Sequence, residues 1–268
     1  MDKIIKILNC SGLRLFSAVP LSDCIITRPY KLEKAGFSET DKLFAIMLAV
    51  PYLTKQSKRN LSAYAVSRDY HLFYKELFSD ILPKLEREFD GYRFAGFADD
   101  SPIDERDAAA KAGLGIIGDN GMLITEKYSS YIFLGEIITN MPIDCAAQPV
   151  KRCQGCGKCK EACPMNETNE CLSALTQKKG ELTESERAFI KNFGSVWGCD
   201  RCQEVCPHTL RAIKNQTVYT DIEFFKSNTI PHLTLELLDS MDDEEFSKRA
   251  YSWRKRETIR RNLEIIEE

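Results

Sequence analysis

Eight of the eleven cysteines lie between residues 153 and 206, and seven of these eight form two short runs. In the first run, CQGCGKCKEACP, intervals of two, two and three residues separate Cys153, Cys156, Cys159 and Cys163, and Pro164 follows. This is the spacing of the bacterial 4Fe–4S run, in which three thiolates wrap one cluster and the fourth serves a neighbouring cluster. Gly155 and Gly157 relieve crowding where the backbone passes close to sulfide.

The second run, CDRCQEVCP, is one cysteine short of a full ligand set. Cys171 lies between the runs and completes the eight thiolates that two clusters require. Because the fourth cysteine is exchanged between clusters, we assign the first cluster to Cys153, Cys156, Cys159 and Cys206. The second cluster is assigned to Cys163, Cys171, Cys199 and Cys202.

Two other interpretations of these cysteines are zinc knuckles and unrelated buried thiols. Zinc favours pairs of Cys-x2-Cys with longer separations, whereas a three-cysteine run that ends in Cys-Pro occurs here twice. Iron–sulfur ligation is therefore favoured. Cys10, Cys24 and Cys145 remain, and we expect them to be small buried hydrophobic residues.

Composition restricts the class of protein. The 268 residues are 43% hydrophobic and 29% charged, which excludes wholesale disorder. The net charge of −3 excludes a uniformly basic nucleic-acid coat but leaves room for a local patch. No apolar run approaches the roughly 20 residues that span a bilayer, and the first ten residues do not resemble a signal peptide, so we expect a cytoplasmic protein.

The elements that must position this chemistry are predicted from hydrophobic patterning. Residues 1–145 are expected to form an α/β domain in which a strand over 43–50 is buried on both faces. Helical spacing covers 61–89, where Pro83 is expected to kink or divide the helix. Further elements are predicted as a strand at 92–98, a helix at 104–113 and strands at 121–125 and 130–139.

The cysteine runs lie in a second predicted domain, residues 146–215, which is rich in loops. Its expected helices cover 171–179 and 184–196. A third segment, 216–268, is expected to be helical from residue 234 onward.

Several segments resemble the epoxyqueuosine reductase family, cobalamin- and iron–sulfur-dependent enzymes of queuosine tRNA modification. They are SAYAVSRDYHLFYKELF (62–78), FADDSPIDERDAAAKAGLGIIGDNGMLITEKYSSYIFLGEIITNMPI (97–143), the cluster segment with CLSALTQKKG (171–180) and GCDRCQEVCP (198–207), and SWRKRETIRRNLEII (252–266). The resemblance implies an α/β (α+β) corrinoid-binding domain, then a ferredoxin-like double 4Fe–4S domain and a helical tail. We expect a short form without the C-terminal helical-repeat module of many relatives.

The resemblance implies a mechanism as well. The clusters reduce a corrinoid that has no histidine ligand from the protein, the reduced cofactor attacks the epoxide, and a carboxylic acid protonates the oxygen. The family's proton donor corresponds to Asp99, and its polar partners correspond to His71 and Arg106. The resemblance also implies that Asp99 contacts the corrinoid together with Ser62, Leu123, Leu134, Ser173 and Asp200.

The residues themselves leave alternatives open. Asp99 follows an apolar strand and could enter a cleft, or the DDS segment could cap the helix at 104. Arg106 could hold an oxygen or phosphate with its planar fork, or pair with an acid on its own helix. His71 could be an ordinary core histidine. The glycines of AGLGIIGDN (112–120) are expected to form a loop that approaches the flat corrin ring.

The chain departs from the family at Asp119, where a lysine is usual, and at Asp100-Ser101, where Thr-Gly is usual. These departures bear on the substrate and leave the cluster ligands untouched.

The segment 248–261 is basic, and Trp253 and Tyr251 are interleaved with its basic residues. Together with Lys178 and Lys179, it forms either an RNA-binding patch or a solvated helix face.

The expected partners are a tRNA anticodon loop that carries epoxyqueuosine and an external electron donor of the flavodoxin or ferredoxin type, and the chain is expected to be a monomer. Two other functions stay open. One is a corrinoid-dependent reductase of another substrate, similar to reductive dehalogenases. The other is a two-cluster electron-transfer module without catalytic activity.

Overall fold

The computed structural model describes residues 2–56, 58–168 and 170–268 and divides into two compact units. The first unit comprises the chain up to Pro51 and Phe73–Gly155, and the second comprises Tyr52–Leu72 and Cys156–Glu268. The segment 52–72 therefore packs with residues far along the chain. The division into domains 1–145, 146–215 and 216–268 stays a prediction.

A four-stranded antiparallel sheet forms the centre of the first unit, in the order β1-β2-β6-β3. The strands are β1 (Phe16–Pro20), β2 (Phe44–Pro51), β3 (Phe94–Phe97) and β6 (Ile132–Thr139). Every residue of β2 is buried, as its unbroken apolar sequence predicts, and it pairs along its whole length with β6. The strands expected at 92–98 and 130–139 are confirmed by β3 and β6.

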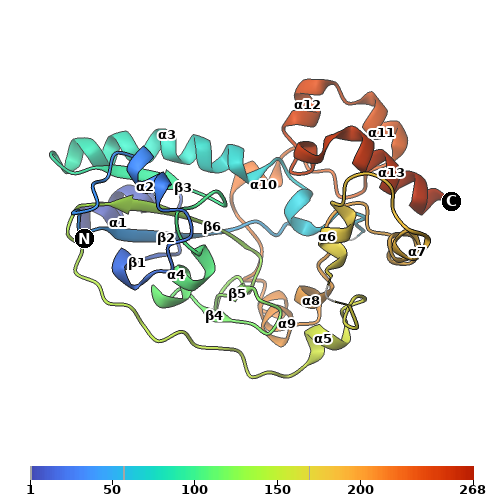
Figure 1. The fold of residues 1–268 in the computed structure, drawn as a ribbon, viewed down its shortest axis with the longest axis horizontal. Coiled ribbons are helices and arrows are strands. Elements are labelled where there is room, and N and C mark those ends of the chain that lie inside the picture. The colour runs from blue at the N-terminus through green and yellow to red at the C-terminus, as the bar shows by residue number, and fades with distance from the viewer. Residues whose placement is uncertain (1, 57, 169) are drawn as a thin grey trace. The chain divides into compact units, whose positions relative to one another are not determined.

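Helices cover the two faces of this sheet, as Figure 1 shows for α3 (Tyr70–Glu88) and α4 (Glu105–Lys111). The ring of Tyr74 in α3 lies directly against Gly135 of β6. A side chain at position 135 would collide with this ring. From α4, three consecutive buried alanines pack with alternate residues of β2 on the opposite face. Helix α4 confirms the helix expected at 104–113, and Asp104 caps it by accepting from two backbone N–H groups.

The helix expected over 61–89 differs from the prediction at two points. Only a short 3-10 helix, η2 (Ala63–Ala65), precedes α3, which begins at Tyr70. Of the two predicted effects of Pro83, a division of the helix is wrong, because α3 continues to Glu88, and a kink stays a prediction. Pro83 is exposed, while Ile81 and Leu85 are buried on either side of it, so their packing offsets the hydrogen bond that proline removes.

Shorter elements complete the first unit. They are α1 (Asp2–Cys10), η1 (Leu21–Asp23), α2 (Tyr30–Lys34), and a two-stranded antiparallel ribbon of β4 (Ile116–Ile117) and β5 (Leu123–Ile124). Strand β5 lies within the strand expected at 121–125, whereas α1 and β1 belong to a region for which no element was predicted.

The second unit consists of short helices: α5 (Lys158–Glu161), α6 (Leu172–Thr176), α7 (Glu184–Phe193), α8 (Arg201–Glu204), α9 (Pro207–Lys214), α10 (Glu223–Lys226), α11 (Leu235–Ser240), α12 (Asp243–Ser247), η3 (Ser252–Arg254) and α13 (Lys255–Glu267). Helices α6 and α7 confirm those expected at 171–179 and 184–196, and the tail is helical as predicted. A core around Trp197 and Tyr251 joins the segment 61–66 to these helices. In the described part of the chain, no helix is long and apolar enough to cross a membrane.

The close contact between α3 and the sheet gives a first prediction. A Cβ added at Gly135 would lie 2.5 Å from the ring of Tyr74, whose hydroxyl donates to the Phe133 carbonyl at 3.1 Å. We expect Gly135→Ala to lower the free energy of unfolding by about 1–3 kcal/mol, as overpacking of a core does. Urea denaturation measures this, with Ser79→Ala on the exposed face of α3 as the control. Equal stability of the two variants would contradict the contact.

Candidate functional site

The cysteine loops use glycines in left-handed conformations and short helices to place their thiols. Gly155 and Gly157 have φ values of 66° and 78°, and α5 begins directly after Gly157. Within the second unit, α5 carries Cys159, α8 carries Cys202, and the two helices contact each other. All eleven cysteines are free thiols. The prediction that Cys10 is buried is wrong, because it is exposed at the end of α1.

Three of the cysteines assigned to the second cluster lie near one another. Cys163 and Cys199 pack against the same apolar cluster, which α6 and α7 help to form, and Cys171 is close enough to Cys199 to act on its ionisation. Burial raises the pKa of Cys199, and a hydrogen bond from the backbone of Arg201 opposes that shift. This neighbourhood suits a shared ligand set.

In the first unit, the backbone N–H of Asp119 donates to the Cys153 Sγ at 3.3 Å. Hydrogen bonds of this kind orient thiolate ligands and tune iron–sulfur centres. Among the described residues, no three His, Cys, Asp or Glu side chains converge on a point as ligands of a single metal ion would. Thiolates are the donors that a 4Fe–4S cluster takes, one on each iron, so the chemistry of the eight cysteines is compatible with the predicted clusters.

The buried carboxylate of Asp200 joins the second cysteine run to an upstream segment. The hydroxyl of Ser62 and the backbone N–H of Ala63 each donate to it at 2.6 Å. The guanidinium of Arg59 lies 3.3 Å from the same carboxylate and 2.8 Å from that of Glu204. Burial raises the pKa of Asp200, while Arg59 and these donors oppose the shift. Both carboxylate oxygens of Asp200 thus accept from protein donors.

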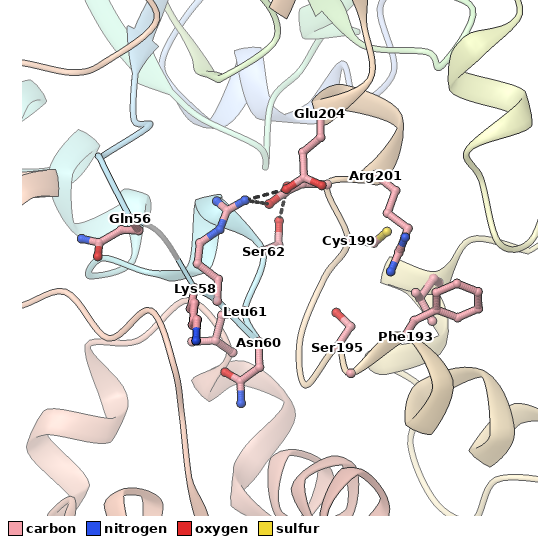
Figure 2. Close-up of a pocket in the computed structure, with 14 residues that line it drawn as sticks. Gln56, Lys58, Asn60, Leu61, Ser62, Phe193, Ser195, Cys199, Arg201 and Glu204 are labelled. Carbon is pink, nitrogen blue, oxygen red and sulfur yellow. Dashed lines mark hydrogen bonds and ion pairs between the residues drawn. The ribbon is translucent and has the colours of Figure 1, made fainter. Parts of the chain in front are cut away.

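A cavity of about 470 Å³ lies beside this network (Figure 2). Figure 2 shows the thiol of Cys199 among the side chains that line it, which include Lys58, Ser62, Phe193 and Arg201. The guanidinium of Arg201 lies 4.6 Å from the centre of the Phe193 ring. The cavity therefore places cationic, aromatic and hydroxyl groups next to a predicted cluster ligand.

Ser173 belongs to the same neighbourhood. The amide of Gln177 donates to the Ser173 hydroxyl at 3.2 Å and to the Tyr64 hydroxyl at 3.5 Å. Burial raises the pKa of Tyr64, and both Ser173 and Asp200 lie near enough to influence it. Three of the predicted corrinoid contacts, Ser62, Ser173 and Asp200, thus gather around one segment of the second unit.

Asp99 follows β3 in the first unit and occupies a left-handed turn with φ of 60°. Its backbone N–H donates to a carboxylate oxygen of Glu105 at 3.1 Å. Arg28 covers the turn: its guanidinium lies 3.2 Å from the carboxylate of Asp100 and 3.3 Å from the carbonyl of Ser101. Asp104, not Asp99, caps α4, which removes the capping interpretation of Asp99.

Arg106 lies on the exposed side of α4, where its guanidinium donates to the carbonyl of Gly121 at 3.0 Å. Leu123 is buried in the apolar core of the first unit, and Leu134 packs against that core.

His71 belongs to the second unit and is exposed, with Nδ1 2.8 Å from the carboxylate of Asp69. The interpretation of His71 as an ordinary core histidine is therefore wrong.

The glycine loop 113–118 approaches protein atoms closely. A Cβ at Gly115 would lie 2.4 Å from the carbonyl oxygen of Ile124, and one at Gly118 would meet the side chain of Asn120 at 2.5 Å. The glycines are thus required by packing within the first unit.

Sequence analysis missed the buried acid Glu136 and its half-buried neighbour Glu105. The available signal was a charged residue at position 136 inside the apolar strand IFLGEIIT.

Comparison with known proteins identifies the family. No family model matches the chain. It is 32% identical to the epoxyqueuosine reductase of Lactococcus garvieae over 225 residues, which cover 80% of this chain and 62% of the relative. It is 31% identical to that of Gloeobacter violaceus over 229 residues (81% and 70%), and 32% identical to that of Synechocystis over 216 residues (76% and 74%). The chain belongs to the epoxyqueuosine reductase family.

Solved structures of epoxyqueuosine reductases have the same mixed α/β fold. The enzyme from Streptococcus thermophilus matches with a TM-score of 0.76 and 25% identity over 99% of this chain and 80% of that one. An epoxyqueuosine reductase crystallised with an epoxyqueuosine-modified tyrosine tRNA stem loop matches with the same values. The likeness therefore extends over residues 1–60, where the sequence resemblance is weakest.

The basic segment 248–261 of this family member is largely occupied by contacts within the second unit. Arg256 donates to the carbonyls of Leu238 and Met241, both at 2.8 Å. Arg260 pairs with an acid of α11, and Arg261 donates to carbonyls that follow α6. Trp253 is 57% exposed, with the Arg254 guanidinium 4.0 Å from its ring. Most of these arginines tie helices together, which favours the structural interpretation for them.

The Asp200 network gives a second prediction. We expect Asp200→Ala to lower the free energy of unfolding by about 3–5 kcal/mol, because it leaves Arg59 and two buried donors without their acceptor. Glu204→Gln is the matched control: its carboxylate is half-exposed, so losing its pair with Arg59 should cost about 1 kcal/mol or less. Denaturant unfolding compares the two, and a small effect of Asp200→Ala would contradict the role given to Asp200.

Proposed function

We propose that this chain reduces the epoxide of epoxyqueuosine in tRNA to the alkene of queuosine, with electrons passing through two 4Fe–4S clusters to a corrinoid. Membership of the epoxyqueuosine reductase family carries the proposal, supported by the likeness to a family member crystallised with a modified tRNA stem loop. The reaction balances when two electrons and two protons remove the epoxide oxygen as water and leave a carbon–carbon double bond.

The corrinoid, when bound, would supply a strong nucleophile for the epoxide carbon. The residues of this chain supply the rest. Asp99 would donate a proton to the epoxide oxygen as it becomes an alkoxide, from the end of a strand where its backbone is held by Glu105. Arg106 is exposed and would hold an oxygen or phosphate of the substrate. His71, oriented by Asp69, would assist as a polar partner.

The second unit would supply polar contacts to the corrinoid. Ser62 and Asp200 line the cavity beside Cys199, and Ser173 lies near them, so hydroxyl and backbone groups are available there. Because protein donors occupy the carboxylate of Asp200, it would act by fixing this wall. Leu123 and Leu134 would supply apolar contacts from the first unit.

The two cysteine runs would hold the clusters in a ferredoxin-like arrangement with the exchanged ligand sets assigned above. The remaining proposals concern the surroundings of the enzyme: a flavodoxin or ferredoxin as electron donor, a monomeric state and a cytoplasmic location, where tRNA is modified. No observation on this chain favours a dehalogenase-like substrate or an electron-transfer module without catalytic activity.

The cluster assignment predicts the iron content. After anaerobic reconstitution, we expect about eight irons per chain, and Cys171→Ser should retain about four, because the second cluster loses a ligand. Cys10→Ser is the control, since Cys10 is an exposed thiol outside both ligand sets. Metal analysis measures both. Zinc in place of iron, or full iron content in Cys171→Ser, would refute the assignment.

The proton-donor role predicts a separation of binding from turnover. We expect Asp99→Asn to bind cobalamin with an unchanged absorption spectrum and to reduce epoxyqueuosine-containing RNA about 10²–10⁴-fold more slowly. Asp100→Asn, which neutralises the adjacent exposed carboxylate, should lose less than about tenfold, because exposed ion pairs contribute little. Full activity of Asp99→Asn would remove this residue from the mechanism.

A further inference from the structure

Two carboxyl groups lie together inside the first unit, between the sheet and α4. Glu136 is in the middle of β6 and fully buried, and its neighbours across the sheet are Met47 and Phe97. Glu105 is the first residue of α4. Apolar surroundings on this face deprive the Glu136 carboxylate of the hydration that a charge requires, and Glu105 is half-buried.

The contacts of Glu136 leave one of its oxygens without a donor. Ser101 donates its hydroxyl to Oε1, but Oε2 is buried without a donor among the described residues. Glu105 and Glu136 are within hydrogen-bonding reach of each other. Two carboxylates cannot bond, whereas a carboxylic acid and a carboxylate can, so a single proton between them satisfies this contact.

Glu105 is hydrogen-bonded to the backbone of the predicted proton donor, Asp99. The N–H of Asp99 donates to Oε1 of Glu105 at 3.1 Å, and Asp99 has a φ of 60°, a conformation that non-glycine residues seldom adopt. Glu105 thus holds the turn that aims Asp99. A negative charge on Glu105 also opposes a second negative charge on Asp99, because the two groups repel each other.

The charges around the pair favour retention of the proton. Burial raises the pKa of Glu105 to about 7 and that of Glu136 well above its usual value. Glu105 raises the pKa of Glu136 further, whereas the contact with Glu136 lowers that of Glu105. The other titratable groups that act on the pair are Asp99, Asp104 and Cys24. The nearby cations are bonded to other acids: Arg28 and Lys31 to Asp100, and Lys111 to Asp107.

We propose that Glu105 and Glu136 share one proton near neutral pH, and that Glu105, as a positioning residue, holds the Asp99 turn and keeps the Asp99 carboxyl in its acid form. Only the part that concerns Asp99 rests on the proposed function. The shared proton is a property of the first unit and can be measured without substrate.

Infrared spectroscopy of the cluster-loaded wild-type protein tests the shared proton. At neutral pH a protonated-carboxyl stretching band should be present, and it should persist well above the pH at which an ordinary glutamic acid ionises. Glu136→Gln should lack the band, while Glu126→Gln, an exposed acid of the same unit, should keep it. Absence of the band from the wild type overturns the proposal, whatever the variants do.

Thermal stability gives a second readout that needs no substrate. A carboxyl whose pKa is raised by folding stabilises the folded state below the pKa of the unfolded chain, and this contribution is lost as pH rises through the folded pKa. The melting temperature of the wild type relative to Glu136→Gln should therefore fall as pH rises from about 4.5, the usual pKa of a glutamic acid, through the raised pKa of Glu136. A difference independent of pH would contradict a shared proton.

Turnover against pH tests the link to Asp99. Glu105→Gln keeps an acceptor for the Asp99 N–H but removes the charge, so the alkaline limb of the profile should move down by about one pH unit, a roughly tenfold loss above it. In Glu136→Gln the amide donates to a charged Glu105, so the limb should stay in place. Equal losses in both variants without movement of the limb would show a merely structural role. If no variant or wild type acts on the RNA while the band is present, the proposed function fails and the shared proton stands.

Discussion

A buried carboxylate requires donors, and in the second unit this requirement fixes how the cysteine run is held. Asp200 lies between two cysteines of that run and takes its donors from the segment around Ser62 and from Arg59. Because these partners come from more than 130 positions upstream, the loop cannot shift without leaving a buried charge unpaired. The position of Cys199, on the wall of the cavity in Figure 2, depends on that attachment.

The first unit also contains a buried carboxyl group that needs polar partners. Its sheet is covered by helices on both faces, so β2 and β6 are almost entirely apolar. Glu136 is the exception, and it is tolerated because Ser101 and Glu105 surround it with polar atoms. The polar contacts between the sheet and α4 therefore lie at the start of α4 and at the turn with Asp99 that follows β3.

The sequence predicts the features that depend on local spacing. The cysteine runs, the apolar strand at 43–50 and the helix at 104–113 are of this kind, and the structure has both the strand and the helix. Sequence-based prediction fails where contacts with distant segments determine the local structure. Pro83 does not divide its helix because the residues around it are buried, and the arginines of α13 bind carbonyls of distant segments that no local pattern identifies.

The path of the chain between the units has a consequence for engineering. Because residues 52–72 pack with the part that begins at 156, neither half is a continuous stretch that can be excised. A fragment that begins at 156 would retain seven of the eight cysteines predicted to bind clusters, and it would lose the segment around Ser62 that donates hydrogen bonds to Asp200. Transplanting these loops into a foreign scaffold thus requires carrying a piece of the amino-terminal half along with them.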